Sequence, residues 1–136
     1  RKEIEHMREQ EKEHLRAFNE EMVERRVRPT ILNPFWHVGG YIMGAATAAL
    51  GKRSAMACTV AVESVIDQHY AEQEEDLKAL DSEPELLAKV SKFREEEMEH
   101  HDLALEHEAK KAPGYPIING VVSGITKLAI ELSKRI

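Results

Sequence analysis

The residues with the clearest chemical potential in this 136-residue chain are two Glu-Xaa-Xaa-His pairs, Glu11 with His14 and Glu97 with His100. Three residues along an α-helix correspond to roughly 300° of rotation and about 4.5 Å of rise, so each pair projects from nearly one face. Helical bundles that hold two metal ions use such pairs on two helices, with further Glu side chains from the others. The spacing alone is weakly specific, because a third pair near the N-terminus also fits it.

The helix face separates these two pairs from the third, which is Glu3 with His6. Apolar residues recur every three or four positions on both sides of each of the first two pairs, and the same steps lead to the Glu and His positions. These apolar residues are Ile4, Met7, Phe18 and Met22 in the first segment, and Leu86, Val90, Phe93 and Ala104 in the second. Glu3 and His6 lie one residue off the stripe and are predicted at the surface. The other two pairs are predicted to face the core.

A third segment places Glu63 on its apolar stripe, between Val60–Val62 and Val65–Ile66. An unpaired buried carboxylate costs several kcal/mol, while a whole domain has only about 5–15 kcal/mol of net stability. A single such Glu is most often neutralised by Arg or Lys. Five polar residues on three stripes instead favour a multivalent metal ion.

Composition indicates one compact helical domain, residues 1–136. Charged residues make up 32% of the chain and aromatic residues 5%, as is typical of helical bundles. The net charge of −6 argues against nucleic acid as a partner. The one cysteine, Cys58, excludes an internal disulfide and lies in an apolar run where a packed thiol is expected.

Five helices are predicted, with proline and glycine marking the breaks between them. No strand alternation is visible, so the fold class is all-α, and the last helix is amphipathic. The expected ranges are 2–25, 34–50, 53–79, 83–110 and 116–135.

Residues 34–50 are apolar on nearly every side, although the segment is shorter than the ~20 residues needed to span a bilayer. Trp36 and Tyr41 lie near one end, and cations flank the segment on both sides. This pattern favours shallow insertion into an anionic membrane surface. An ordinary buried helix is the alternative. The flanking cations are Arg25, Arg26, Arg28, Lys52 and Arg53.

Four strings carry a resemblance that extends over residues 1–136. They are QEKEHL (10–15), RVRPT (26–30), AMACTVAVE (55–63) and FREEEMEHHD (93–102). With them the chain resembles the 5-demethoxyubiquinone hydroxylase family of ubiquinone biosynthesis, which are ferritin-like diiron monooxygenases. The resemblance implies a ferritin-like bundle with an extra apolar, membrane-facing helix. It also implies hydroxylation of the ring of a demethoxy-polyprenyl-quinol.

The resemblance also implies roles for the core-facing residues. Glu11 and Glu97 match carboxylates that bridge two irons, His14 and His100 match one imidazole ligand per iron, and Glu63 matches a terminal carboxylate.

Two neighbouring residues are expected to act in catalysis by the same resemblance. Tyr70, two turns beyond Glu63, resembles a tyrosine near the iron, and His69 lies beside it as a supporting residue. His107 is predicted to point inward, with no ligand role.

Cofactors and partners follow from the resemblance as well. They are two Fe ions, NADH as reductant, a polyprenyl quinol substrate, a lipid-binding partner protein and assembly as a homo- or hetero-oligomer. The expected location is peripheral, at the matrix side of the mitochondrial inner membrane or the cytoplasmic side of a bacterial membrane, with contact through residues 34–50. No Gly-rich dinucleotide motif is present, which argues against a Rossmann site.

One family element has no match in this sequence. The family's first helix carries an Asp-His-Ala-Gly-Glu motif that supplies a sixth ligand, so five of six ligands are expected here, and the activity of this chain by itself is uncertain. Two other functions stay open: an iron-binding or ferroxidase protein with the same ligands, and a non-catalytic membrane-associated scaffold.

Overall fold

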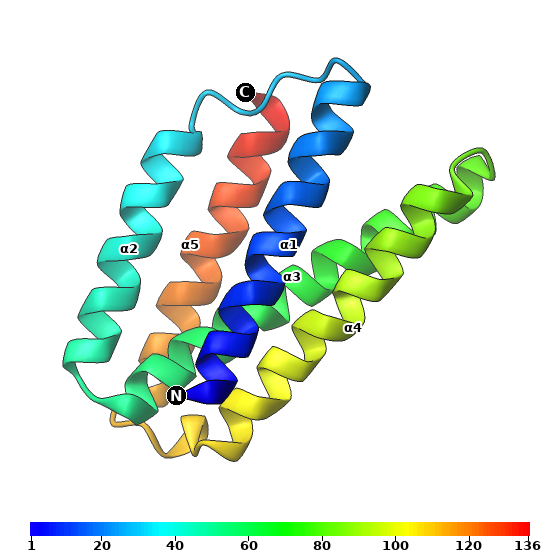
Figure 1. Ribbon diagram of the computed structural model, residues 1–136. Coiled ribbons are helices and arrows are strands. Elements are labelled where there is room, and N and C mark those ends of the chain that lie inside the picture. Colours follow the sequence, from blue (N-terminus) through cyan, green and yellow to red (C-terminus); the bar gives the residue numbers. More distant parts are fainter.

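A computed structural model describes residues 1–136 as five α-helices and one short 3₁₀ helix, with no strand (Figure 1). This confirms the all-α prediction and is consistent with a ferritin-like helical bundle. The elements are α1 (Lys2–Glu24), α2 (Asn33–Ala49), α3 (Lys52–Leu80), α4 (Pro84–Glu106), η1 (Ala109–Lys111) and α5 (Tyr115–Arg135).

The long helix α3 organises the molecule. It forms an antiparallel hairpin with α4, and α5 and α2 pack against it and against each other (Figure 1). The first helix, α1, lies along α4 and has no other close helix neighbour at backbone level. Helix α3 supplies more buried residues than any other helix. Five residues of α4 and His14 of α1 are buried as well.

Proline and glycine set most of the observed helix boundaries. Pro34 and Pro84 occupy the first turns of α2 and α4, where the missing N–H costs nothing. Gly51 (φ 118°) and Gly114 (φ 69°) precede α3 and α5, in backbone conformations that favour glycine. Four of the five predicted helices therefore agree with the structure to within one or two residues at each end.

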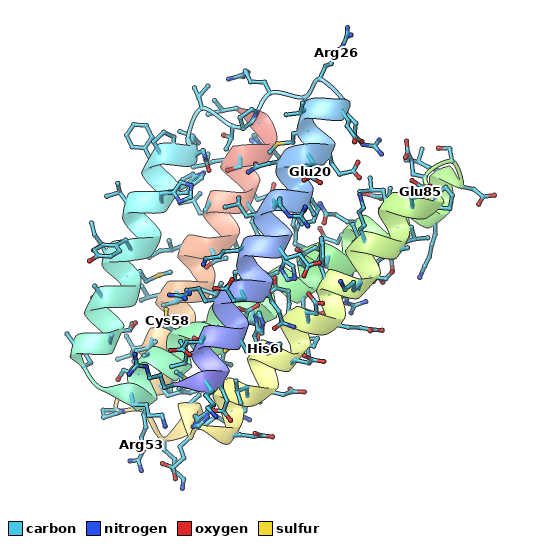
Figure 2. The ribbon with its side chains drawn as sticks, viewed as in Figure 1. His6, Glu20, Arg26, Arg53, Cys58 and Glu85 are labelled. Carbon is cyan, nitrogen blue, oxygen red and sulfur yellow. The ribbon has the colours of Figure 1, made fainter.

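The exception is the helix predicted over 83–110, which ends at Glu106. Glu108 adopts a left-handed conformation (φ 65°), and its carboxylate pairs with Arg53 at 2.6 Å, at the end of the molecule where α3 begins (Figure 2). Ala109 is then fully buried against Val60 and Ala104. This packing bends the chain toward α3 and so ends α4 early, which sequence periodicity did not predict.

Cys58 is buried and packs with Ala61 and Val122, as expected for a structural thiol (Figure 2). Burial raises the pKa of this thiol, which disfavours the reactive thiolate.

The apolar helix α2 lies at the edge of the molecule rather than in its interior. Only Thr47 is buried along its whole length, so the alternative of an ordinary buried helix is wrong. Trp36 is half-buried, and its Nε1 donates to Ser133 Oγ of α5 at 2.7 Å. The exposed side chains of this helix include Phe35, Val38, Tyr41 and Ile42. None of the five helices combines the length and the apolar character that crossing a bilayer requires.

Candidate metal centre

Three helices bring acidic and imidazole groups together inside the bundle. One ligand atom from each of Glu11 (α1), Glu63 (α3), Glu97 and His100 (α4) lies within 4.8 Å of all the others. The last three are buried, whereas Glu11 is half-exposed. His14 of α1 is buried beside them, with its Nδ1 2.8 Å from Glu97 Oε1. All five predicted ligands therefore converge.

Two of the carboxylates lie between the same two imidazoles. Glu97 places Oε1 2.8 Å from His14 Nδ1 and Oε2 3.3 Å from His100 Nδ1. Glu11 places Oε1 3.2 Å from His100 Nδ1 and Oε2 4.0 Å from His14 Nδ1. Glu63 approaches only His100, at 3.9 Å. A carboxylate with one oxygen toward each imidazole has the arrangement needed to bridge two cations.

Each imidazole is also held from outside by a residue of the other Glu-Xaa-Xaa-His helix. His14 Nε2 lies 2.6 Å from Glu96 Oε2, and His100 Nε2 lies 2.8 Å from Gln10 Oε1. When Nε2 donates its proton to these oxygens, Nδ1 turns a lone pair toward the carboxylates, as ligand histidines require. Gln10 and Glu96 were not predicted. The sequence does contain a pattern that could have indicated them, because a Gln or Glu directly precedes both Glu-Xaa-Xaa-His motifs.

The electrostatics of the cluster reflect burial of several like charges. Burial raises the pKa of Glu63 to about 8, and the nearby carboxylates add to the rise. Burial alone would lower the pKa of His100, but the negative carboxylates of Glu11, Glu63 and Glu97 beside its Nδ1 outweigh it and raise the pKa to about 11. Burial would raise the pKa of Glu97, yet the adjacent imidazoles of His100 and His14 hold it well below its usual range.

The donor set fits divalent metal ions. Three buried polar atoms have no hydrogen-bond partner, namely Glu63 Oε2, Glu97 Oε2 and His100 Nδ1, and all three belong to the cluster. No Arg or Lys neutralises Glu63, whose only ion-pair partner is His100, so the alternative in which Arg or Lys neutralises this carboxylate does not hold. Buried polar atoms without partners cost about 1–3 kcal/mol each, and a cation would satisfy them together. Carboxylate oxygen and imidazole nitrogen suit iron, manganese or zinc.

Tyr70 is buried on the side of α3 that faces this cluster. Its ring stacks on Phe18 at 6.3 Å and packs with Val90 and Phe93, while Phe93 lies 4.2 Å from the His14 ring. Burial, with the nearby carboxylates, raises the pKa of Tyr70, so the phenol stays neutral.

Its neighbour His69 instead faces α5. It lines a cavity of about 230 Å³ between the two helices, together with Lys134. Burial and the nearby Lys134 charge lower its pKa.

The remaining polar candidates lie away from the centre. Glu3 and His6 are exposed, as predicted. His107, predicted to point inward, is only partly buried and bonds through Nε2 to Glu3 Oε2 at 2.7 Å. It is the C-terminal capping residue, directly after the last residue of α4, so the helical period that placed it inward no longer applies there.

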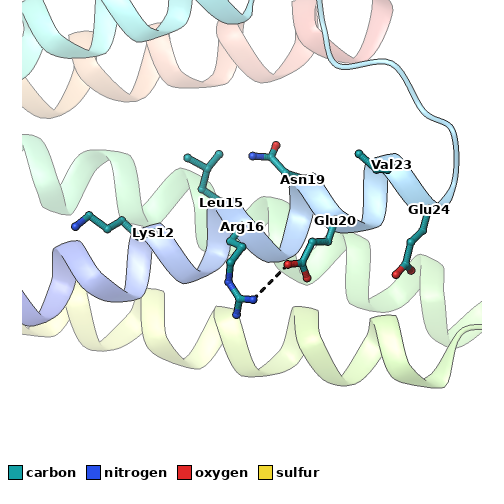
Figure 3. A pocket seen from close by; sticks show the side chains of 7 residues that line it. All are labelled: Lys12, Leu15, Arg16, Asn19, Glu20, Val23 and Glu24. Carbon is teal, nitrogen blue, oxygen red and sulfur yellow. Dashed lines mark hydrogen bonds and ion pairs between the residues drawn. The ribbon is translucent and has the colours of Figure 1, made fainter.

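A surface hollow of about 570 Å³ also lies outside the cluster. All its lining residues belong to α1, between Lys12 and Glu24, with an Arg16–Glu20 ion pair at 3.2 Å (Figure 3). It contains none of the five predicted ligands and is part of the exposed face of α1.

An all-helical bundle with a carboxylate and imidazole cluster on three helices is consistent with the ferritin-like class of proteins, in which such a cluster can hold metal ions. Within that class the chain belongs to the family described as Ubiquinone biosynthesis protein COQ7, which it matches over residues 1–133.

Curated relatives agree with this family. The chain is 53% identical over 137 residues to "NADPH-dependent 3-demethoxyubiquinone 3-hydroxylase, mitochondrial" of Bos taurus, covering 98% of this chain and 62% of that protein. It is 44% identical to "3-demethoxyubiquinol 3-hydroxylase" of Rhodospirillum rubrum, over 98% of the chain and 62% of the relative. It is 36% identical to "5-demethoxyubiquinone hydroxylase, mitochondrial" of Saccharomyces cerevisiae, over 98% and 63%. The chain thus spans about three fifths of the length of these relatives.

Proposed function

We propose that this chain carries the metal centre of a diiron monooxygenase that hydroxylates the ring of a demethoxy-polyprenyl-quinol in ubiquinone biosynthesis. One observation carries the proposal: the only buried side-chain atoms without hydrogen-bond partners are oxygens and a nitrogen of one carboxylate–imidazole cluster. The names of the relatives support the reaction and substrate class.

The placement of the five residues suggests how two ions would be held. Glu11 and Glu97, each lying between the two imidazoles, would contact both ions. His14 would bind one ion, and His100 with Glu63 the other. Bound irons would supply redox chemistry toward O₂. The overall reaction would place one oxygen atom on the ring as a hydroxyl and release the other as water, with two electrons from a nicotinamide reductant and two protons.

Residues of this chain would prepare the site for that reaction. Glu96 and Gln10 orient the imidazoles from outside the cluster. The packed rings of Phe18, Tyr70 and Phe93 exclude water from one side. Tyr70 is proposed to act at the metal centre as a neutral phenol. His69 lies on the other face of α3 and lines the cavity next to α5. Its proposed role is therefore only a supporting one, without contact to the metal ions.

We further propose that α2 meets the membrane in which the quinol dissolves. Its exposed apolar side chains (Phe35, Val38, Tyr41 and Ile42) suit shallow insertion. Several relatives are named mitochondrial, which supports a mitochondrial location, and one is from a bacterium. The further proposal of peripheral placement on the mitochondrial inner membrane or a bacterial cytoplasmic membrane rests on the exposed apolar side chains of α2. A lipid-binding partner protein and an oligomeric assembly remain parts of this proposal.

Anaerobic reconstitution with Fe(II) tests the metal centre. We expect two iron ions per chain by elemental analysis, and Glu97→Ala is expected to abolish them because Glu97 would touch both ions. The controls Glu3→Ala and His6→Ala, which change exposed residues, should leave iron unchanged. Full iron content in Glu97→Ala would remove this assignment.

A second measurement separates the reaction from its alternatives. Adding O₂, a reductant and a short-chain demethoxyquinol should yield a product heavier by one oxygen atom, detected by mass spectrometry. Iron oxidation without product would favour a ferroxidase, and absence of bound iron would favour a non-catalytic scaffold.

A further inference from the structure

An apolar cavity of about 380 Å³ lies between α1, α3 and α4, at the end of the molecule where α1 leads into the segment before α2 (Figure 1). Six of its ten lining residues are hydrophobic, namely Phe18, Met22, Val27, Leu77, Leu86 and Val90. Sites for small molecules are mostly apolar and have volumes of about 300–1,000 Å³. This cavity therefore has the size and the lining of a ligand site, and the proposed metal centre makes no use of it.

The polar part of the lining indicates a neutral ligand. It consists of Glu21, Arg25, Gln73 and Asp76. Glu21 pairs with Arg25 at 2.9 Å and with Lys89 of α4 at 2.6 Å, and Arg25 also pairs with Glu83 at 2.8 Å. Asp76 is exposed. Because the one cation of the lining is already paired, the cavity offers no free positive charge to an anion, and an apolar molecule without charge suits it better.

Phe18 separates this cavity from the metal centre. It lines the cavity and meets Phe93 edge-on, with the ring centroids 5.5 Å apart, and Phe93 in turn lies 4.2 Å from the His14 ring. On α1, His14, Phe18 and Met22 follow at steps of four residues and so share one helix face. Met22 is then about 12 Å along the helix from His14. A ligand that fills the cavity would end one aromatic side chain away from the predicted metal ligands.

The other end of the cavity lies toward the helix for which membrane contact is proposed. Val27, in the segment between α1 and α2, lines the cavity and is exposed. Ile31 and Phe35 follow along the chain and are exposed as well, and Phe35 belongs to α2. Exposed apolar side chains therefore lead from α2 to the cavity, which gives a lipid-soluble molecule a route to it.

We propose that this cavity binds the polyprenyl tail of the quinol, at the isoprene units next to the ring, with Phe18 between the tail and the metal centre. The inference rests on the proposed function, because it places the tail of that substrate. A prenyl tail fits better than a fatty acyl chain because it carries an aromatic ring. The cavity leads to the packed rings of Phe18, Tyr70 and Phe93, on which a quinol ring can stack.

Equilibrium dialysis of the 136-residue protein against a geranyl-substituted benzoquinone tests the proposal. The wild type should bind this probe at least about tenfold more tightly than the same quinone without its tail, because burial of apolar groups adds affinity. Leu77→Trp fills the cavity and should weaken probe binding at least about tenfold, without changing the affinity for the tail-free quinone. Met22→Trp fills the cavity from α1 and should repeat this loss, which separates filling of the cavity from damage to α3. Leu80→Trp is the matched control: the same change one turn further along α3, at an exposed residue outside the cavity, should leave binding unchanged.

Three outcomes would overturn the cavity assignment: equal affinity of the wild type for the two quinones, unchanged probe binding in both cavity-filling variants, or an equal loss in Leu80→Trp. Equally strong displacement of the probe by decanol, a linear chain with as many carbon atoms as geranyl, would assign the cavity to acyl chains and also overturn it. Iron content, measured on the same samples, keeps the two proposals separate. A protein that binds the probe in the cavity but loads no iron contradicts only the metal centre, and one that loads iron but binds both quinones equally contradicts only the cavity.

Discussion

At the scale of single residues, the two Glu-Xaa-Xaa-His motifs interlock. The residue four positions before each histidine bonds to the histidine of the other helix, Gln10 to His100 and Glu96 to His14. Each imidazole is thus fixed by its partner helix and not by its own. This arrangement makes the orientation of either ligand depend on correct docking of α1 against α4.

Replacing Gln10 with Ala is expected to weaken metal binding by about 10–100-fold, the usual cost of losing a group that orients a ligand histidine. The reason is that His100 would lose the acceptor for its Nε2 proton. Metal titration of the purified variant checks this. Asn19→Ala removes an exposed amide of the same helix (Figure 3) and should change nothing. Unaltered affinity in Gln10→Ala would show that the crossed bond does not orient His100.

Metal uptake should depend steeply on pH. In the metal-free protein the pKa is about 8 for Glu63 and about 11 for His100, so both groups carry a proton at pH 7. Metal needs both groups deprotonated, so binding releases protons and affinity rises with pH. Between pH 6 and 8 we expect the metal affinity to rise by about tenfold or more per pH unit. Titration with Co(II) at constant ionic strength measures the slope, and a flat profile would contradict the protonation states.

At the scale of elements, α2 and α1 are the least embedded helices. Helix α2 is connected to α5 by the bond from Trp36 to Ser133, and its Met43 packs against the core cluster of Cys58, Ala61 and Val122. Its side chains Phe35, Val38, Tyr41 and Ile42 are exposed. A test of membrane contact at Trp36 would also break this internal bond. The exposed residues of α2 are therefore better probes of the membrane proposal.

Phe35→Glu should weaken binding to anionic vesicles by about tenfold or more, because a Phe side chain contributes about 1.5–3 kcal/mol on burial. Phe35 is 68% exposed, so the change should leave the fold intact. Leu80→Glu, at the far end of α3 and 65% exposed, is the matched control. Co-sedimentation with vesicles measures both. Equal loss in the two variants would mean that α2 has no special role in membrane contact.

At the scale of the whole molecule, the metal centre would connect α1 more firmly to the α3–α4 hairpin. At backbone level α1 has only α4 as a close neighbour, whereas the cluster combines α1 with α3 and α4. Ligands that bind only the folded state stabilise it. Here the stabilisation by bound metal should be largest for α1.

Metal loading should therefore slow amide hydrogen exchange in α1 by about tenfold or more, with smaller changes in α3, whose packing is already extensive. Hydrogen-exchange mass spectrometry with and without Zn(II) makes the comparison. The variant Glu97→Gln should lose the effect, because it removes a carboxylate that lies between both histidines. An equal slowing of hydrogen exchange in all helices would contradict a stabilisation that acts on α1 through the metal cluster.

Much of this protein follows from its sequence alone. Proline and glycine fix local backbone geometry, so the helix boundaries were predictable to within a residue or two, apart from the end of α4. A polar residue on an apolar stripe has one inward direction, so Glu11, Glu63 and Glu97 were predictable as core-facing.

Only the tertiary structure decided which groups meet. Periodicity gives the face of a residue but not its neighbour on another helix. The bonds of Gln10 and Glu96 to the histidines span 90 and 82 residues of sequence, and they depend on how α1 docks on α4. For the same reason His69 faces α5 while Tyr70, one residue and about 100° further on, faces the metal centre, and the apolar cavity beside Phe18 exists only where α1, α3 and α4 meet.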